Sequence, residues 1–306
     1  MNPMTSSQLP RLLDKRLREV SERAFKELSE GRIEQLYRML STESAFEEFY
    51  EIGALPDIPE FNGELQFLSV APGYYTKVEP KEFAGGVLFE RKLLDDKKYN
   101  VMDNRAAMLA EAAARVREKY GVRPFAYAFS SAYDFQTSEE AVSLCSTAHT
   151  TKAGVSTATG FSNSGTSALS KTSVAATRLL MRKFKNDIGE RISIEPDTLL
   201  VPDSLYDTAM EIVGTPAGYD TAALDKNMQA GRYKVIPYLR LDDYSTKNWF
   251  MLDSRLMKRF LLWLDRIKPE VNNQIDFNTY QVKHSIYFRI GNGFTNWRFI
   301  YGHNVA

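Results

Sequence analysis

The stretch DNRAAMLAEAAARVREKYG, residues 103–121, carries the strongest secondary-structure signal of the chain and decides the fold around it. Its middle consists almost entirely of alanine, leucine, methionine, glutamate and arginine, the residues with the highest helix propensities. We therefore predict a helix over Asn104–Tyr120, with Asp103 as its N-cap and Gly121 at its end. Such a helix is about 25 Å long. Its many alanines allow another element to approach it closely.

The N-terminal part of the chain favours two further helices. In the first, residues 8–30, apolar side chains recur every three to four positions. A second helix is predicted over residues 32–51, where Ser44 and Glu47 have the spacing of a capping box. Each helix has only a narrow apolar stripe, so each needs a surface to lie against. That surface belongs either to the same domain or to a neighbouring copy of the chain.

Residues 53–102 differ in character from the helical parts on either side. Prolines and glycines occur throughout, and between them lie three short extended runs, Leu65–Val70, Tyr74–Val78 and Val87–Leu94. We interpret this segment as a long two-stranded excursion and not as part of a core sheet. Because an isolated hairpin is only marginally stable in water, the excursion should need a partner surface.

The part of the chain that follows the long helix mixes strands and helices. Its clearest strand covers residues 277–290, where apolar residues, including His284 and Ile290, alternate with polar ones. From residue 192 onward the pattern is α/β, with strands and helices in alternation. The other expected elements are strand-like runs at 125–129 and 141–149, an exposed Ser/Thr/Gly-rich loop at 150–170, a helix at about 170–187, a strand at Ile192–Val201, a short helix at Asp203–Val213, and strands at Tyr233–Leu241 and Trp249–Leu252.

Composition narrows the classes of protein to consider. The chain has 39 Lys and Arg against 39 Asp and Glu, so it lacks the global basic excess of proteins that live on nucleic acid. Cys145 is its one cysteine, which excludes an intrachain disulfide and indicates assembly in a reducing compartment. No apolar run approaches the roughly 18 residues that span a bilayer, and no signal-peptide pattern is found. We expect synthesis in the cytosol and no membrane partner.

The search for reactive groups predicts no catalytic, cofactor-binding or metal-binding residue, and no cofactor. His149, His284 and His303 are far apart and lack the spacing of metal ligands. His284 lies on the apolar side of its predicted strand, where a hydrogen-bonded core histidine is expected. A nucleophilic pair of Cys145 and His149 is disfavoured, because nothing electropositive surrounds the cysteine.

Three weaker patterns also favour structural interpretations. Gly291-Asn292-Gly293 begins a dinucleotide-binding motif but lacks its third glycine, so we expect a turn between two strands. The acidic pairs Asp95–Asp96 and Asp242–Asp243 are expected in solvated loops and not in cation sites. The loop at 150–167 lacks the lysine and glycine pattern of a phosphate-binding loop. Because residues scattered in sequence can assemble an active site, a soluble enzyme stays open as an alternative.

Ordered blocks in the second half of the chain carry a family resemblance. The blocks are LCSTAH (144–149), ALSKTSVAATRLLMRKFKNDIGE (168–190), IEPDTLLVPDSLYDTAMEIV (194–213), GRYKVIPYL (231–239), WFMLD (249–253) and FNTYQVKHSIYFRIGNGFTNWRFIYGHN (277–304). In this order and spacing they resemble the major head subunits of tailed bacteriophages, specifically the Mu-like group with the Hong Kong 97-type capsid fold. The resemblance covers about residues 100–306, and the first 100 residues match more by organisation than by sequence.

The resemblance implies an α+β capsid subunit with four parts. These are an N-terminal arm (1–52), an extended loop that overlaps an adjacent subunit (53–102), a peripheral domain that contains the long spine helix (103–189, completed by about 263–290), and an axial domain (190–262, with 291–306 as a further candidate part).

The implied function is that of a major capsid protein with no enzymatic activity. Copies would self-assemble into hexamers and pentamers of an icosahedral head that encloses double-stranded DNA, located in the virion after assembly in the host cytoplasm. An encapsulin-like compartment with the same fold is the alternative. The implied partners are other copies of the chain, a portal at one vertex, decoration proteins, and packaged DNA held without sequence preference, with Arg11, Lys15 and Arg18 as candidate DNA contacts. Because about 50 residues precede the extended loop, we expect a separate scaffolding protein and no proteolytic cleavage.

Overall fold

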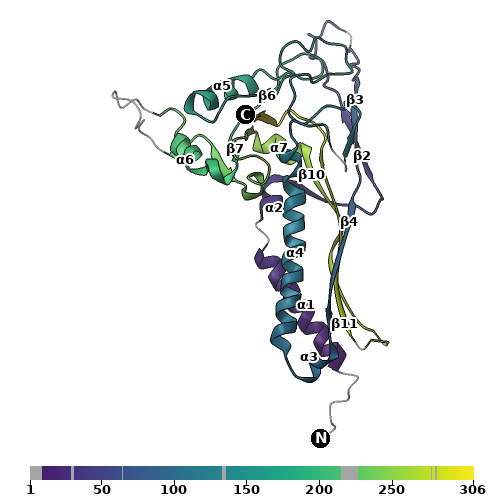
Figure 1. Ribbon diagram of the computed structural model, residues 1–306. Coiled ribbons are helices and arrows are strands. Elements are labelled where there is room, and N and C mark those ends of the chain that lie inside the picture. Colours follow the sequence, from purple (N-terminus) through teal and green to yellow (C-terminus); the bar gives the residue numbers. More distant parts are fainter. Residues whose placement is uncertain are drawn as a thin grey trace, which may run out of the picture.

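A long helix, α4 (Tyr99–Ala126), forms the axis of the subunit in the computed structural model (Figure 1). Long strands and helix α1 run beside it toward one end, and shorter strands and helices form a broader opposite end. The fold mixes helices and sheets, as predicted. The structure describes residues 9–28, 31–63, 65–132, 136–214, 227–276, 278–279 and 281–306.

Helix α4 confirms the predicted long helix but extends beyond it at both ends. The N-cap is Lys98, and the predicted cap, Asp103, instead lies inside the helix and binds Arg16 at 2.6 Å. Gly121 also lies inside the helix. A Cβ atom at this position would come within 2.9 Å of the side chain of Ile33, so glycine serves close packing here and not helix termination.

The C-terminal end of α4 is completed by a distant side chain. Pro124 has no N–H to donate to the carbonyl oxygen of Tyr120, a bond that an uninterrupted helix would make. The buried side-chain amide of Asn292 donates to that oxygen at 2.6 Å. The helix therefore continues to Ala126, and the run at 125–129, predicted as a strand, forms its last turn and the residues after it.

A four-stranded sheet lies against α4. Its order is β1-β10-β11-β4, with β1 parallel to β10 and the other pairs antiparallel. The strands are β1 (Arg38–Ser41), β4 (Lys81–Phe89), β10 (Leu261–Ile275) and β11 (Val282–Phe294). Strand β11 confirms the predicted alternation over its first nine residues. Aromatic rings fill the space between sheet and helix: Phe83 stacks on Phe288 at 5.3 Å, and Tyr120 meets Trp263 edge-on at 6.0 Å.

Helix α1 (Leu9–Leu28) packs on α4 of the same chain (Figure 1), which is the first of the two alternatives that its apolar stripe allowed. The buried side chain of Leu17 joins a small cluster with Phe89, Met102, Ala106 and Val282. The short side chain of Ala106 permits this close approach.

A five-stranded sheet forms the centre of the broader end. Its order is β6-β12-β9-β7-β8, and the strands are β6 (Ser164–Gly165), β7 (Thr198–Val201), β8 (Lys234–Pro237), β9 (Trp249–Leu252) and β12 (Ile300–His303). The sheet thus takes strands from both sides of residue 190. The other helical segments are α2 (Arg32–Leu36), α3 (Arg91–Asp95), α5 (Lys171–Met181), α6 (Tyr206–Gly214), α7 (Ser254–Phe260), and the 3-10 turns Asp203–Leu205 and Leu239–Leu241.

A third, three-stranded sheet has the order β2-β3-β5, with strands β2 (Glu47–Ile52), β3 (Pro72–Val78) and β5 (Gln136–Ser138). Strands β2 and β3 form an antiparallel hairpin. The excursion predicted from residues 53–102 is thus confirmed in its run Tyr74–Val78, which lies in β3. It was wrong in its later part, because β4 belongs to the four-stranded sheet and pairs along its whole length with β11. Phe83 and Phe89 of β4 pack into the protein, an apolar pattern that the surrounding glycines obscured.

The predicted helix over residues 32–51 was also wrong beyond Leu36. Tyr37 is extended, and the chain then enters β1, which is paired in register with the buried strand β10. Ser44 and Glu47 do not form a capping box: the Ser44 N–H and the Glu47 carboxylate both bond to the Thr42 hydroxyl. Long-range strand pairing overrides the local helical pattern here.

Candidate functional site

An exposed apolar segment joins the two strands of the β2–β3 hairpin. The N–H of Gly53 donates to the carbonyl oxygen of Ala71 at 3.1 Å, which closes the neck of the hairpin. We call residues 54–70 the apolar loop. Its described residues form neither helix nor strand. It and the adjoining end of β2 expose large apolar side chains: Ile52 (80%), Leu55 (58%), Ile58 (88%), Phe61 (71%), Leu65 (72%) and Phe67 (91%).

The apolar loop is a candidate binding surface because a folded chain in water gains nothing from exposing such side chains together. Contiguous exposed apolar surface on a soluble protein commonly marks a site of protein association. The loop sequence also contains Asp57, Glu60 and Glu64 but no lysine or arginine. A partner for this surface should therefore offer apolar contacts with neutral or basic surroundings.

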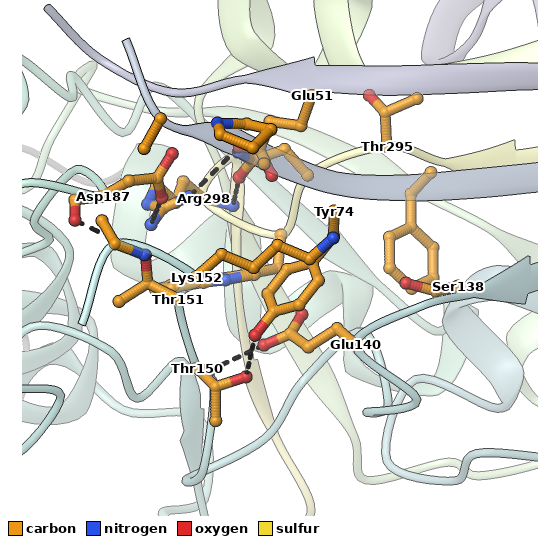
Figure 2. Close-up of a pocket in the computed structure, with 17 residues that line it drawn as sticks. Glu51, Tyr74, Ser138, Glu140, Thr150, Thr151, Lys152, Asp187, Thr295 and Arg298 are labelled. Atoms are coloured by element: carbon orange, nitrogen blue, oxygen red, sulfur yellow. Dashed lines mark hydrogen bonds and ion pairs between the residues drawn. The ribbon is translucent and has the colours of Figure 1, made fainter. Parts of the chain in front are cut away.

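A group of buried polar side chains lies at the base of the hairpin (Figure 2). Glu51 of β2 accepts a hydrogen bond from the side-chain amide of Asn296. The guanidinium of Arg298 lies 3.5 Å from a Glu51 oxygen and 2.8 Å from a carboxylate oxygen of Asp187. Arg298 also donates to the carbonyl oxygen of Lys185 at 2.7 Å. One buried arginine thus links the hairpin to two other segments of the chain.

The environment of Glu51 favours its neutral form. Burial is the largest cause and raises the pKa of Glu51 to about 7, and the nearby carboxylates of Asp187 and Glu140 act in the same direction. Arg298 and the hydrogen bond from Asn296 oppose the shift without cancelling it. The carboxyl group therefore titrates near neutral pH.

His149 occupies the second half of this site. Its Nδ1 lies 3.1 Å from a carboxylate oxygen of Glu140, and its Nε2 lies 3.0 Å from the side-chain oxygen of Asn163. The ring stacks on Trp297 with 4.2 Å between centroids and 9° between planes. We call Glu51, Glu140, His149, Asp187 and Arg298 the junction cluster.

The sequence gives no local signal for the junction cluster, since Glu51 and Arg298 are 247 residues apart. The sequence-predicted features lie elsewhere or have other partners. Cys145 is buried, and burial raises the pKa of its thiol. The ring nitrogens of His149 face Glu140 and Asn163.

The other two histidines are core residues. His284 is buried, with Nε2 3.1 Å from the Ser21 hydroxyl and Nδ1 against Asn273, so the prediction of a hydrogen-bonded core histidine is confirmed. The Nδ1 of His303 accepts from the N–H of Ser167 at 3.1 Å, and Nε2 lies 2.8 Å from the Thr177 hydroxyl. Burial lowers the pKa of His303 to about 4.

The remaining patterns also have structural roles. Gly291-Asn292-Gly293 lies inside β11, so the predicted turn was wrong. Glycine at 291 leaves room for residues 78–80, which would approach a Cβ atom to 3.3 Å. The carboxylate of Asp242 accepts from the backbone N–H of Asp203 at 2.8 Å and thus caps a short turn. Across the described parts of the chain, no group of three or more ligating side chains could hold a metal ion. No helix in those parts is long and apolar enough to cross a membrane.

Solved structures share this fold at low sequence identity. The mature capsid of bacteriophage PhiM1 matches with a TM-score of 0.59 at 10% identity, covering 90% of this chain and 86% of that chain. The capsid of cyanophage P-SCSP1u gives 0.55 at 11%, covering 89% and 87%. The capsid of an empty GTA particle gives 0.53 at 11%, covering 91% and 90%. The predicted Hong Kong 97-type capsid fold is therefore confirmed. No curated protein matches the chain significantly.

The family comparison agrees with these structures. The sequence profile described as phage capsid protein matches residues 74–302, which include α4, the four-stranded sheet except β1, and the five-stranded sheet. The match extends well beyond the blocks that carried the resemblance. The chain belongs to the phage capsid protein family and is a structural subunit of a virion shell.

Proposed function

We propose that copies of this chain assemble as hexamers and pentamers into an icosahedral head around double-stranded DNA, and that the apolar loop makes a principal contact with an adjacent copy. The observation that carries the proposal is the exposed apolar surface of this loop in a chain of the capsid family. In a shell every copy of the chain has a neighbouring subunit, and that neighbour can cover the apolar loop.

The energetics favour a repeated contact of this kind. Transfer of one large apolar side chain from water into an interface contributes about 1.5–3 kcal/mol. The loop and the end of β2 present six such side chains on one short segment. Each contact in a ring of subunits is heterologous, so every copy both donates its loop and receives another.

We propose the following division of labour along the chain. Residues 1–52 form an arm, the extended loop lies within 53–102, residues 103–189 with about 263–290 form the peripheral domain around the spine helix, and 190–262 with 291–306 form the axial domain. Two observations support refinements. The hydrogen bond between Gly53 and Ala71 supports a shorter protruding loop, residues 54–70. The pairing of β6 with β12 supports adding Ser164–Gly165 to the proposed axial domain.

The proposed role is structural and not enzymatic, with partners beyond other copies of the chain. These are a separate scaffolding protein, a portal at one vertex, decoration proteins, and packaged DNA bound without sequence preference. Lys15 and Arg18 of α1 remain candidate DNA contacts, and both are exposed. Arg11 has a side chain outside the described set.

Electron microscopy and sedimentation of the purified chain test the proposal. Closed shells or discrete capsomers are expected, and a stable monomer at all concentrations would overturn it. Replacement of residues 54–70 by a short glycine–serine turn should leave the subunit folded, because the neck bond between residues 53 and 71 stays in place, yet abolish shells. Normal shells from this variant would contradict the role of the loop. Nuclease-protected DNA in particles from infected cells separates a phage head from an encapsulin-like compartment.

A further inference from the structure

The junction cluster connects three parts of the subunit that are remote in sequence. Glu51 belongs to the hairpin, Glu140 to the segment after β5, and Asp187 and Arg298 to segments beside the five-stranded sheet, as Figure 2 shows. His149 lies further along the segment after β5. Glu51 is followed by Ile52 and the neck glycine, Gly53, and the apolar loop begins directly after them. Whatever changes the strength of this cluster therefore changes how firmly the hairpin is held.

The hydrogen bonds of Asn163 determine what the ring of His149 must offer. The Asn163 amide nitrogen donates to the carbonyl oxygens of Leu144 at 2.8 Å and Ile300 at 3.2 Å, and its oxygen accepts from the N–H of Ser146 at 2.7 Å. This network assigns the side-chain oxygen, and not the nitrogen, to the side facing His149. The Nε2 atom must therefore carry a proton to donate.

The other ring nitrogen of His149 also faces an acceptor. The Glu140 oxygen that contacts Nδ1 already accepts from the backbone N–H of Thr150 at 2.7 Å. A hydrogen bond between this ring nitrogen and the carboxylate therefore requires a second proton, which His149 and Glu140 share. The ring also stacks on the indole of Trp297. His303 provides the contrast, because its Nδ1 accepts a backbone N–H and one ring proton satisfies it.

The charge balance of the cluster requires protons as well. Three carboxylates, Glu51, Asp187 and Glu140, face one permanent cation, Arg298. The nearby Lys152 and Glu139 pair with each other at 2.5 Å and add no net charge. Two uncompensated negative charges are costly in a partly buried site. One proton shared by His149 and Glu140 and one proton on Glu51 make the cluster neutral.

We propose that the junction cluster is a proton-dependent latch. It holds the β2–β3 hairpin against the rest of the subunit while Glu51 is protonated and His149 and Glu140 share a proton, and it loosens the hairpin when Glu51 loses its proton. The latch consists of contacts within one chain, so it does not depend on the proposed shell contacts. It extends the proposed function by making the position of the apolar loop sensitive to pH.

The direction of the pH effect follows from Glu51. Because its pKa is raised from 4.5 to about 7 in the folded chain, mainly by burial, the folded junction binds this proton more tightly than the unfolded chain does. The stabilising contribution is complete below the ordinary glutamate pKa and is lost as pH rises to about 7. Above that pH the cluster holds one uncompensated negative charge, and the hairpin should be held less firmly.

Amide hydrogen exchange of the full chain, kept in one assembly state, tests the latch. Peptides from β2 and β3 are compared at about pH 5.5 and about pH 8, after correction for intrinsic exchange rates. We expect protection of the hairpin to fall on the order of tenfold at the higher pH, while β7 and β9 stay protected. Equal hairpin protection at both pH values would overturn the proposal.

Three variants sharpen the test. Glu51→Gln keeps a neutral side chain at all pH values, so its hairpin should remain protected at the higher pH. The matched control, Glu48→Gln, alters an exposed carboxylate on the same strand and should behave like the wild type. His149→Phe keeps a flat ring beside Trp297 but has no ring protons, so it should lower protection at both pH values. Wild-type behaviour of Glu51→Gln or of His149→Phe would contradict the latch.

Discussion

Truncation of two loop side chains, Ile58→Ala together with Phe67→Ala, should weaken shell assembly without weakening the subunit. Both side chains are almost fully exposed in the subunit, at 88% and 91%, so their removal opens no cavity and costs little folding free energy. In an interface, each side chain buried in full contributes about 1.5–3 kcal/mol. Alanine retains the Cβ atom, so the double variant should lose about 2–4 kcal/mol per loop contact. At about 1.4 kcal/mol per tenfold, the contact weakens roughly 30- to 700-fold.

Sedimentation velocity over a concentration series measures this loss directly. The concentration at which shells first appear should rise steeply in the apolar double variant, and its subunit should keep the wild-type melting temperature. The matched control, Asp57→Ala together with Glu60→Ala, changes two exposed polar residues of the same loop and should assemble close to the wild-type concentration. If the apolar double variant assembles at the wild-type concentration, the loop does not bury these side chains against a neighbour, and the proposed contact is refuted.

Three further changes probe the fold that carries the loop. Leu17→Ala should lower the free energy of unfolding in urea by about 2–5 kcal/mol, because it opens a cavity between α1 and α4. A loss no larger than that of a substitution at an exposed position of α1 would contradict the packing of this helix. Asn292→Ala should cost about 1–3 kcal/mol, because it removes the hydrogen bond that the Asn292 amide donates to the carbonyl oxygen of Tyr120. The further change Pro124→Ala supplies a backbone N–H at that position and should recover part of the loss. The stabilising contribution of neutral His303 is complete above pH 6.5 and is lost as pH falls toward 4, where its pKa lies. In thermal melts, acid should therefore lower the free energy of unfolding of His303→Gln by about 2 kcal/mol less than that of the wild type. An equal acid dependence in the two proteins would rule this out.

Local patterns in the sequence predicted those elements whose stability is itself local. The alanine-rich run at α4 and the alternation of β11 each contain their own signal, and both were confirmed. The helix prediction for the residues after Leu36 was wrong for the opposite reason. Their conformation depends on pairing with β10, more than 200 positions away, and nothing in the local pattern reports that pairing. Helix α4 combines local and long-range determinants. Its alanine-rich middle has a local signal, whereas its extension past Tyr120 depends on a hydrogen bond from the side-chain amide of Asn292.

The same distinction between local patterns and long-range contacts explains which functional surfaces the sequence could predict. The prolines and glycines of residues 53–102, with short extended runs between them, indicated an excursion in need of a partner surface, and the structure exposes large apolar side chains within residues 54–70 of that segment. The junction cluster left no such trace, because its acids are ordinary surface residues by type. They become unusual only when the fold gathers Glu51, Glu140 and Asp187, partly buried, near the buried Arg298.

The position of that cluster gives the hairpin two opposing requirements. Its loop has to protrude far enough to meet a neighbour, yet its base has to be held in one orientation if every copy is to present the loop alike. Apolar packing at the base would hold it permanently, since its strength varies little with pH. A buried group of acids around one arginine can also hold it, but only while protons balance the charge. An evenly matched ion pair would be insensitive to pH near neutrality, so the excess of carboxylates is the feature that makes the attachment of the loop adjustable.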